Sequence, residues 1–240
     1  MADVPTVSVV VPVYNGGYFL QSCVTQLRSY FAEKGLPYEL LIAEDGSTDE
    51  SKALCQVLKD RYPEITLIQA QERLGRGESL QRAIRIAAGN VILYTDVDMA
   101  TDLRHMDTVI GHVTNGDDIV TGSRYLPGSA AKRSFARLVA SRIYNRIVRT
   151  LLDSHVSDHQ CGFKAFKREA VLRLLPHVRS GHWFWDTEIL VRGQISGLRV
   201  SEIPVDWVES PADRSTVKLA GDSFRFFCEV LRLRVELNSG

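Results

Sequence analysis

The sequence ILYTDVDMATD, residues 92–102, runs from an apolar segment directly into two aspartates separated by one residue. The apolar part predicts a strand over residues 91–95, and strand side chains alternate between the two faces of a sheet. Asp96 and Asp98 therefore point to the same side where the strand ends, at the edge where open α/β sheets bind ligands. Two carboxylates there suit Mg²⁺ or Mn²⁺, which share their coordination with substrate phosphates. For an isolated Asp-x-Asp, the simpler hypothesis is that Asp98 caps the next helix.

Strand and helix patterns alternate on both sides of this stretch. The run VSVVVPV at residues 7–13 is almost continuously β-branched, which is typical of a strand buried on both faces. The other predicted strands are at 38–43, 65–68 and 118–123, and the predicted helices are at 51–62, 79–88 and 103–113. Gly89 is the predicted stop of the helix at 79–88. This alternation predicts an α/β fold with a doubly wound, mostly parallel sheet flanked by helices. Because no linker or internal repeat is evident, residues 1–240 are expected to form one domain.

Composition narrows the possible classes of function. The 240 residues are 45% hydrophobic and 24% charged, as in ordinary globular proteins. A net charge of zero gives no whole-molecule basis for binding nucleic acid, so any electrostatic partner must be recognised locally. Four scattered cysteines form neither a zinc motif nor a disulfide framework, which indicates a reducing compartment. No signal segment and no run of about 18 apolar residues is evident, so a soluble or peripheral protein is expected.

The second half of the chain has a different character. It predicts amphipathic helices, at residues 131–152 and 223–237, with a helix at 168–175 and a strand at 200–208 between them. From residue 121 to residue 152 no acidic residue occurs, but there are seven basic ones: Arg124, Lys132, Arg133, Arg137, Arg142, Arg146 and Arg149. This cluster is either a solvated helix face or a surface that binds phosphate or an acidic membrane. The apolar face of the last helix either packs on the core or inserts shallowly into a membrane surface.

Three motifs at predicted strand ends carry a family resemblance. They are VPVYN at residues 11–15, EDGSTD at 44–49 and DVD at 96–98, and together they resemble the inverting family 2 glycosyltransferases with the GT-A fold. The similarity continues through GSR at 122–124, DHQCGFK at 158–164 and WFWDTE at 183–188. These later motifs are similar to the branch that makes polyprenyl-phosphate sugars, and the resemblance covers nearly the whole chain.

Two subgroups of that branch differ at readable positions. Dolichol-phosphate mannose synthases, which use GDP-mannose, typically carry Gln two residues after the second Asp, where this chain has Ala100. Dolichyl-phosphate glucosyltransferases, which use UDP-glucose, usually have Ala there and a QCGFK run, found here at residues 160–164. The match favours the glucosyltransferases. Glu72 departs from the Asn often found in the loop before the Gly75-Arg76-Gly77 turn, so a GDP-mannose donor is the alternative.

The resemblance assigns roles to the donor side. It implies an enzyme that moves a hexose from a nucleotide sugar, UDP-glucose favoured over a GDP-sugar, onto a polyprenyl or dolichyl phosphate. Residues 1–123 would bind the nucleotide sugar and residues 124–240 the acceptor. The implied cofactor is Mg²⁺ or Mn²⁺, held by Asp98 with Asp96 alongside. The other implied donor contacts are Asp96 with the ribose, Asp45 with the base, Pro12 and Tyr14 as walls of the base pocket, and Arg76 with the diphosphate or base.

The resemblance also assigns the acceptor side. The acceptor phosphate would be bound by Arg124, Arg137, Ser141, Arg214 and Ser215, because arginine matches phosphate with two parallel donors. The implied catalytic residues are Asp98, Asp158, Arg124 and Arg137, with Asp158 and Gln160 lining the sugar or acceptor side. Asp186 and Glu188 either join them or form a buried polar network. The expected location is the cytoplasm, peripheral at the cytoplasmic face of a membrane.

Other classes of protein would carry other motifs. A nucleotidyltransferase should have a glycine-rich turn with a basic residue after the first strand, where this chain has PVYNGG at residues 12–17. A dinucleotide-dependent oxidoreductase should have Gly-x-Gly-x-x-Gly in the same turn, and this chain lacks it. A non-catalytic nucleotide-sugar-binding protein is the remaining alternative, and the intact Asp-x-Asp argues against it.

Overall fold

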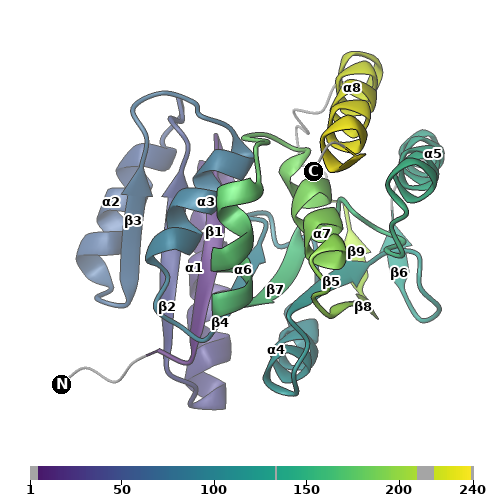
Figure 1. Ribbon diagram of the computed structural model, residues 1–240. Helices are drawn as coiled ribbons and strands as arrows, with labels where there is room; N and C mark the ends of the chain where they lie inside the picture. Colours follow the sequence, from purple (N-terminus) through teal and green to yellow (C-terminus); the bar gives the residue numbers. More distant parts are fainter. Residues whose placement is uncertain (1–4, 133, 210–218, 239–240) are drawn as a thin grey trace.

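The computed structural model describes residues 5–132, 134–209 and 219–238. Within these residues seven strands form one sheet in the order β3-β2-β1-β4-β7-β5-β8 (Figure 1). The strands are β1 Val7–Val13, β2 Tyr38–Glu44, β3 Ile65–Gln69, β4 Val91–Thr95, β5 Ile119–Ser123, β7 Phe163–Lys167 and β8 Val200–Pro204. β7 runs antiparallel to both of its neighbours, and the other neighbouring pairs are parallel. The predicted α/β fold with a mostly parallel sheet is confirmed.

Helices cover both faces of the sheet because its strands alternate their side chains between two apolar clusters. On one face, Val9 and Val11 of β1 pack with residues of the helices α1, α2 and α4, and on the other face Val10 packs with α3, α6 and α7. The helices are α1 Gly17–Lys34, α2 Ser51–Arg61, α3 Arg76–Ile86, α4 Met106–Thr114, α5 Phe135–Leu152, α6 Arg168–Leu174, α7 Trp185–Ile195 and α8 Leu219–Asn238. Short 3-10 helices precede α4, at Leu103–His105, and follow α6, at Leu175–His177.

Several sequence-based boundaries are wrong where distant segments pair. The strand predicted at 200–208 divides into β8 and β9 Asp206–Val208, and β9 pairs with β6 Ala130–Lys132 in a separate small sheet. That pairing takes residues 131 and 132 out of the long helix predicted at 131–152, and α5 begins only at Phe135. The helix predicted at 79–88 begins three residues earlier and ends before Gly89. Gly89 instead lies against the backbone of Ser8, where a Cβ would come within 2.6 Å of the Ser8 nitrogen.

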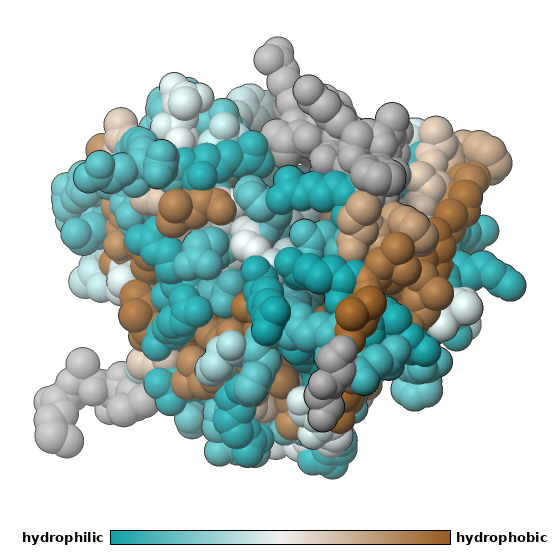
Figure 2. All heavy atoms as spheres, turned by 45° about the horizontal axis from the view of Figure 1, so that its top comes forward, coloured by the Kyte–Doolittle hydropathy of each residue, from teal (hydrophilic) through white to brown (hydrophobic). Residues whose placement is uncertain are grey.

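Helices α5 and α8 stand to one side of the sheet and pack against each other (Figure 1). Val148 and Leu152 of α5 share a buried cluster with Val230 and Leu233 of α8 and with Val191 of α7. Their outer faces carry exposed apolar side chains at four-residue spacing, namely Phe135, Val139 and Ile143 on α5 and Phe227, Leu231 and Val235 on α8. Figure 2 shows apolar residues gathered on this side of the molecule. Across the described segments, no helix combines the length and the apolar character that crossing a membrane requires.

A buried histidine fastens the loop before β7 to α5. His159 Nδ1 lies 2.7 Å from Asn145 Oδ1, and Nε2 lies 2.8 Å from Ser154 Oγ. Because an amide oxygen only accepts hydrogen bonds, Nδ1 carries the proton and Nε2 accepts from the serine hydroxyl. Burial lowers the pKa of His159 to about 3, so the imidazole is neutral in the folded chain at pH 7.

We expect His159 to make the free energy of unfolding fall as the pH drops from about 6.5 towards 3. The unfolded chain binds a proton here below the ordinary pKa of 6.5, whereas the folded chain does not until about pH 3. Each pH unit in this window therefore favours unfolding by up to about 1.4 kcal/mol. Urea unfolding at pH 7, 6, 5 and 4 should show a shallower loss in His159→Gln than in the parent. His155→Gln, at an exposed histidine, is the control; a slope unchanged in His159→Gln would contradict this assignment.

Candidate active site

The two aspartates lie in a tight turn at the end of β4. Met99, with φ 53°, closes the turn by donating its N–H to the Asp96 carbonyl at 3.1 Å. Asp98 Oδ1 accepts the N–H of Ala100 at 3.1 Å. The following 3-10 helix is capped by Asp102, which accepts from the N–H of Arg104. The hypothesis that Asp98 caps the next helix is therefore wrong, and its carboxylate belongs to the turn at the edge of the sheet.

The Asp96 carboxylate rests on the turn that leads into β7. A Cβ at position 162 would lie 1.8 Å from Asp96 Oδ2, so only glycine leaves room for the carboxylate. β7 brings this turn into place because it pairs with β4, with Phe163 opposite Thr95. The glycine of the QCGFK run at 160–164 is thus required by packing, because a side chain at this position would overlap the Asp96 carboxylate.

Arg76 turns inward toward the same aspartate. Its Nη1 lies 2.5 Å from Asp96 Oδ1, and its Nε lies 3.5 Å from Asp186 Oδ2. The guanidinium carbon lies 5.1 Å from the centre of the Trp183 ring and 5.4 Å from that of Tyr94. Arg76 is therefore held between two carboxylates and two aromatic rings at the start of α3.

Behind Arg76 lies a second buried ion pair. Lys164 Nζ lies 2.7 Å from Asp186 Oδ1 and also donates to the carbonyl oxygens of His159 and Cys161. The Tyr94 hydroxyl donates to the same oxygen of Asp186. Burial raises the pKa of Asp186, an effect that Arg76 opposes, and burial lowers the pKa of Lys164. Of the two roles left open for Asp186, the structure supports a buried polar network.

The predicted base pocket gathers at the ends of β1 and β2. Asp45 is buried, and its carboxylate accepts the N–H groups of Leu74 at 2.7 Å and of Gly75 at 3.0 Å. These bonds fix the loop that enters α3 beside Tyr14, whose ring lies 4.0 Å from the Arg73 guanidinium carbon. Pro12 is buried within β1. Tyr14, Asp45 and the loop before Arg76 are therefore neighbours in the structure.

Arg124 leaves β5 at the same edge of the sheet and forms a two-pronged ion pair with Asp158. Its Nε and Nη2 donate to the two carboxylate oxygens at 2.6 and 2.8 Å, and its backbone N–H donates at 3.0 Å. Asp158 is fully buried, and Arg124 holds the pKa of that carboxyl below its usual range against the opposing effect of burial. Glu202 on β8 positions the loop by accepting the N–H groups of Ser157 and Asp158.

The remaining predicted acceptor residues are divided between α5 and the chain after β9. Arg137 forms an ion pair with Glu209, and Ser141 accepts a hydrogen bond from the Tyr125 hydroxyl at 2.6 Å. Arg214 and Ser215 lie outside the described residues. Gln160 donates to Thr187 Oγ1 at 2.9 Å at the start of α7.

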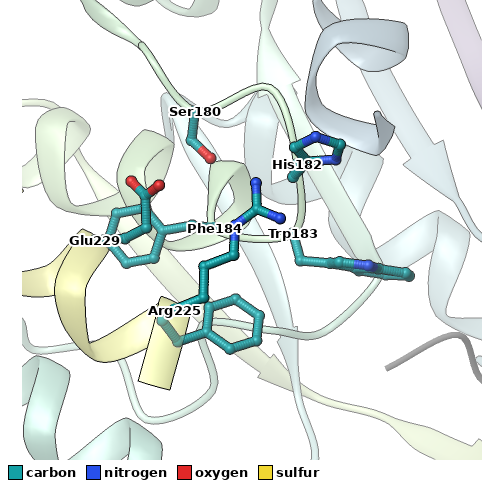
Figure 3. Close-up of a pocket in the computed structure, with 7 residues that line it drawn as sticks. Ser180, His182, Trp183, Phe184, Arg225 and Glu229 are labelled. Carbon is teal, nitrogen blue, oxygen red and sulfur yellow. The ribbon is translucent and has the colours of Figure 1, made fainter. Parts of the chain in front are cut away.

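Sequence reasoning missed several residues that shape the site. Glu202 and Glu209 belong to no sequence motif. Only their contacts in the folded chain, with the loop at Asp158 and with Arg137, show that they belong to the site. A small open pocket between α8 and the segment before α7 was also missed (Figure 3). Its lining residues are Ser180, His182, Trp183, Phe184, Arg225, Phe226 and Glu229. It adjoins the Arg76 loop, because a Cβ on Gly75 would lie 2.3 Å from His182 Nδ1.

The donor atoms suit a divalent cation shared with a phosphate ligand. Asp96 and Asp98 are both partly exposed at the sheet edge. Within the described parts of the chain, no group of three or more Asp, Glu, His or Cys side chains forms a complete metal site. Two carboxylates with open positions are what Mg²⁺ or Mn²⁺ requires when substrate phosphates and water supply the remaining ligands.

Three relatives are similar to nearly the whole of this chain. Glycosyltransferase AglD of Haloferax volcanii is 42% identical over 230 residues, covering 94% of this chain but only 36% of that protein. A dolichyl-phosphate beta-glucosyltransferase of Dictyostelium discoideum is 32% identical over 241 residues, covering 95% of this chain and 73% of that protein. The corresponding Saccharomyces cerevisiae enzyme is 28% identical over 248 residues, covering 95% of this chain and 74% of that protein.

Two solved structures share the fold. Glucosyl-3-phosphoglycerate synthase from Mycobacterium tuberculosis, crystallised with Mn²⁺, UDP and glucosyl-3-phosphoglycerate, superimposes with a TM-score of 0.72 at 18% identity. That match covers 96% of this chain and 80% of the synthase. The mannosyltransferase PcManGT from Pyrobaculum calidifontis, crystallised with GDP-Man and Mn²⁺, gives a TM-score of 0.56 at 21% identity, covering 89% and 59% of the two chains.

The model of the family described as "Glycosyl transferase family 2" matches residues 8–175 of this chain. These residues include the Asp-x-Asp turn and the QCGFK run. The predicted family and enzyme class are confirmed. On this match, the site geometry and the relatives together, the chain belongs to glycosyl transferase family 2 and is a glycosyltransferase.

Proposed function

We propose that this glycosyltransferase moves glucose from UDP-glucose onto a polyprenyl or dolichyl phosphate at a membrane surface, with inversion at the sugar. The main observation in support of this proposal is that Asp96 and Asp98, at the end of β4, share a sheet edge with Arg124, at the end of β5. Only β7 separates these strands, so the two strand ends are about 10 Å apart. An anion-binding arginine and a cation-binding aspartate pair at that separation suit a donor diphosphate and an acceptor phosphate.

The donor half is residues 1–123 in this proposal. Tyr14 and Pro12 border the base. Asp45 contacts the base and also orders the neighbouring loop through its hydrogen bond to the N–H of Leu74. Asp96 reaches the ribose. Mg²⁺ or Mn²⁺ on Asp98 and Asp96 would neutralise the charge that the leaving diphosphate develops. Ala100, the QCGFK run and the relatives named dolichyl-phosphate beta-glucosyltransferase favour uridine over guanosine.

The acceptor half, residues 124–240, works by placing one anion next to another. A lipid phosphate is already ionised at neutral pH, so it needs cations rather than a strong base. Arg124, Arg137 and Ser141 supply that positioning, together with Arg214 and Ser215. Asp158 already uses both oxygens on Arg124, so its role in this mechanism is to aim the guanidinium at the phosphate.

The protein is peripheral at the cytoplasmic face of a membrane in this proposal, and the α5–α8 pair supports contact with a membrane surface. Its outer faces expose six apolar side chains, the largest exposure being 78% for Phe135. Arg142, Arg146 and Arg149 are exposed on α5 as well. An apolar row flanked by basic residues suits the boundary between acyl chains and anionic headgroups. We propose that the lipid tail leaves the site along this surface.

Donor binding should depend on the metal and on uracil. We expect calorimetry to give tighter binding of UDP than of GDP, and UDP affinity to rise when Mn²⁺ is present. Asp98→Ala should remove the Mn²⁺-dependent part of that affinity, because the ion loses one of its two protein carboxylates. Thermal unfolding of the variant controls for folding. Tighter GDP binding would point to the mannose-type alternative, and an Mn²⁺ effect retained in Asp98→Ala would remove the proposed metal site.

Transfer itself should depend on Arg137. In detergent, radiolabelled UDP-glucose and dolichyl phosphate should yield a labelled lipid with the parent enzyme. Arg137→Ala should lower kcat/KM for the lipid roughly 10- to 150-fold, the effect of losing one charge-assisted hydrogen bond, while UDP affinity stays within about twofold. Arg149→Ala removes an exposed charge from the last turn of the same helix and should transfer normally. An inactive parent enzyme would contradict the proposed acceptor, and normal transfer by Arg137→Ala would contradict the role of that arginine.

Membrane binding should depend on the apolar row of α5. The parent protein should sediment with vesicles containing anionic lipid, and less so as salt rises, since exposed charges are screened over about 8 Å at physiological ionic strength. Val139→Ser with Ile143→Ser should weaken sedimentation about tenfold or more, because each aliphatic side chain contributes about 1.5 kcal/mol on burial. Val57→Ser is the control, since Val57 is 59% exposed on α2, a helix that lies on the opposite side of the molecule from α5 and α8 (Figure 1). Unchanged sedimentation of the double variant would exclude this surface.

A further inference from the structure

Arg76 has two acidic partners that differ in their access to a ligand. Asp96 belongs to the Asp-x-Asp turn, and its side chain is 32% exposed. Asp186 lies behind Arg76 at the start of α7, and its side chain is only 3% exposed. A ligand at the sheet edge can therefore draw on Asp96 but cannot reach Asp186. Arg76 itself is 12% exposed, so it can contact such a ligand only from the position in which its partners hold it.

Asp186 is fixed by groups from three elements. Lys164 of β7 and the Tyr94 hydroxyl of β4 both donate to its Oδ1, and its backbone begins α7. The same lysine donates to the carbonyl oxygens of His159 and Cys161, in the turn that carries Gly162 against Asp96. Asp186 is thus connected, through Lys164, to the turn that carries Gly162 against Asp96.

The charges of this cluster balance, and ligand binding disturbs that balance. With Lys164 and Asp186 ionised, the two cations Arg76 and Lys164 face the two carboxylates of Asp96 and Asp186. When a metal–diphosphate ligand engages Asp96, Arg76 gives up one of its two carboxylate partners, and Asp186 is the one that still fixes the orientation of its guanidinium toward the ligand. A buried ion pair adds little net stability compared with apolar side chains of the same volume. The Lys164–Asp186 pair can instead fix the position of Arg76, which lies beside Asp186.

We propose that Asp186 is a positioning residue for the donor: it holds Arg76 beside the diphosphate position when Asp96 turns to the metal and the nucleotide sugar. This inference rests on the proposed function of the Asp-x-Asp turn. Asp186 does not touch the donor, and it acts through Arg76 alone. Lys164 in turn anchors Asp186.

The test compares Asp186→Asn with two further variants. Asp186→Asn should raise the Kd of UDP with Mn²⁺ and the KM for UDP-glucose about tenfold, because Arg76 loses a charged anchor, while the acceptor KM stays unchanged. The double variant Lys164→Met with Asp186→Asn also removes the uncompensated cation, so its thermal stability should recover while the donor affinity stays low. If Asp186→Asn does not fold, the double variant carries the test by itself.

Glu188→Gln is the matched control. Glu188 is fully buried on the same helix, but its carboxylate accepts the N–H of Ser180 and pairs with Arg192, away from Arg76. This variant should lose stability and keep its UDP affinity. Normal UDP affinity in a folded Asp186→Asn variant would overturn the inference, as would recovery of affinity in the double variant or an equal loss in Glu188→Gln. A parent protein that does not bind UDP with Mn²⁺ would overturn the proposed function itself.

Discussion

The antiparallel pairing of β7 with β4 is the constraint on which the site depends. It sets Phe163 opposite Thr95, so the turn before β7 meets the turn after β4. Gly162 can then lie against the Asp96 carboxylate, and Lys164 enters the core beside Tyr94. Because β7 also pairs with β5, the same strand connects the Asp-x-Asp turn after β4 to Arg124 after β5. A strand that reverses direction thus joins two parallel halves at the point where a ligand would bind.

The charged groups of the site are organised in pairs before any ligand arrives. Arg76 lies between Asp96 and Asp186, and Arg124 is gripped by Asp158, which Glu202 helps to position. Such pairing restricts each guanidinium to one orientation, so less conformational freedom is lost when a phosphate binds. It also offsets the cost of placing cations where water is scarce. The arrangement suits a reaction that brings two anions together.

The α5–α8 pair extends the site away from the sheet. Its buried side packs on α7, the helix that carries Asp186, while its outer side exposes two apolar rows. Ser141 links α5 back to Tyr125, the residue after Arg124. A single pair of helices therefore connects the proposed phosphate position with the surface proposed for the membrane, so a lipid need not be drawn fully out of the bilayer.

Local sequence predicted the strands of the main sheet other than β7, the Asp-x-Asp turn and the membership of the family, since strand periodicity and motif spacing are properties of neighbouring residues. The strand β7 was missed. It also predicted that the motifs at residues 11–15, 44–49 and 96–98 lie at one edge of the sheet, because the carboxyl ends of parallel strands share an edge.

Only the tertiary structure decided which partners the charged side chains have. Residues 121–152 carry no acid of their own, yet Glu209, 72 residues from Arg137, pairs with it. The predicted strand at 200–208 breaks, and α5 starts late, because residues 130–132 pair with residues 206–208. Such contacts depend on how the chain packs over long sequence separations, and no local pattern encodes them.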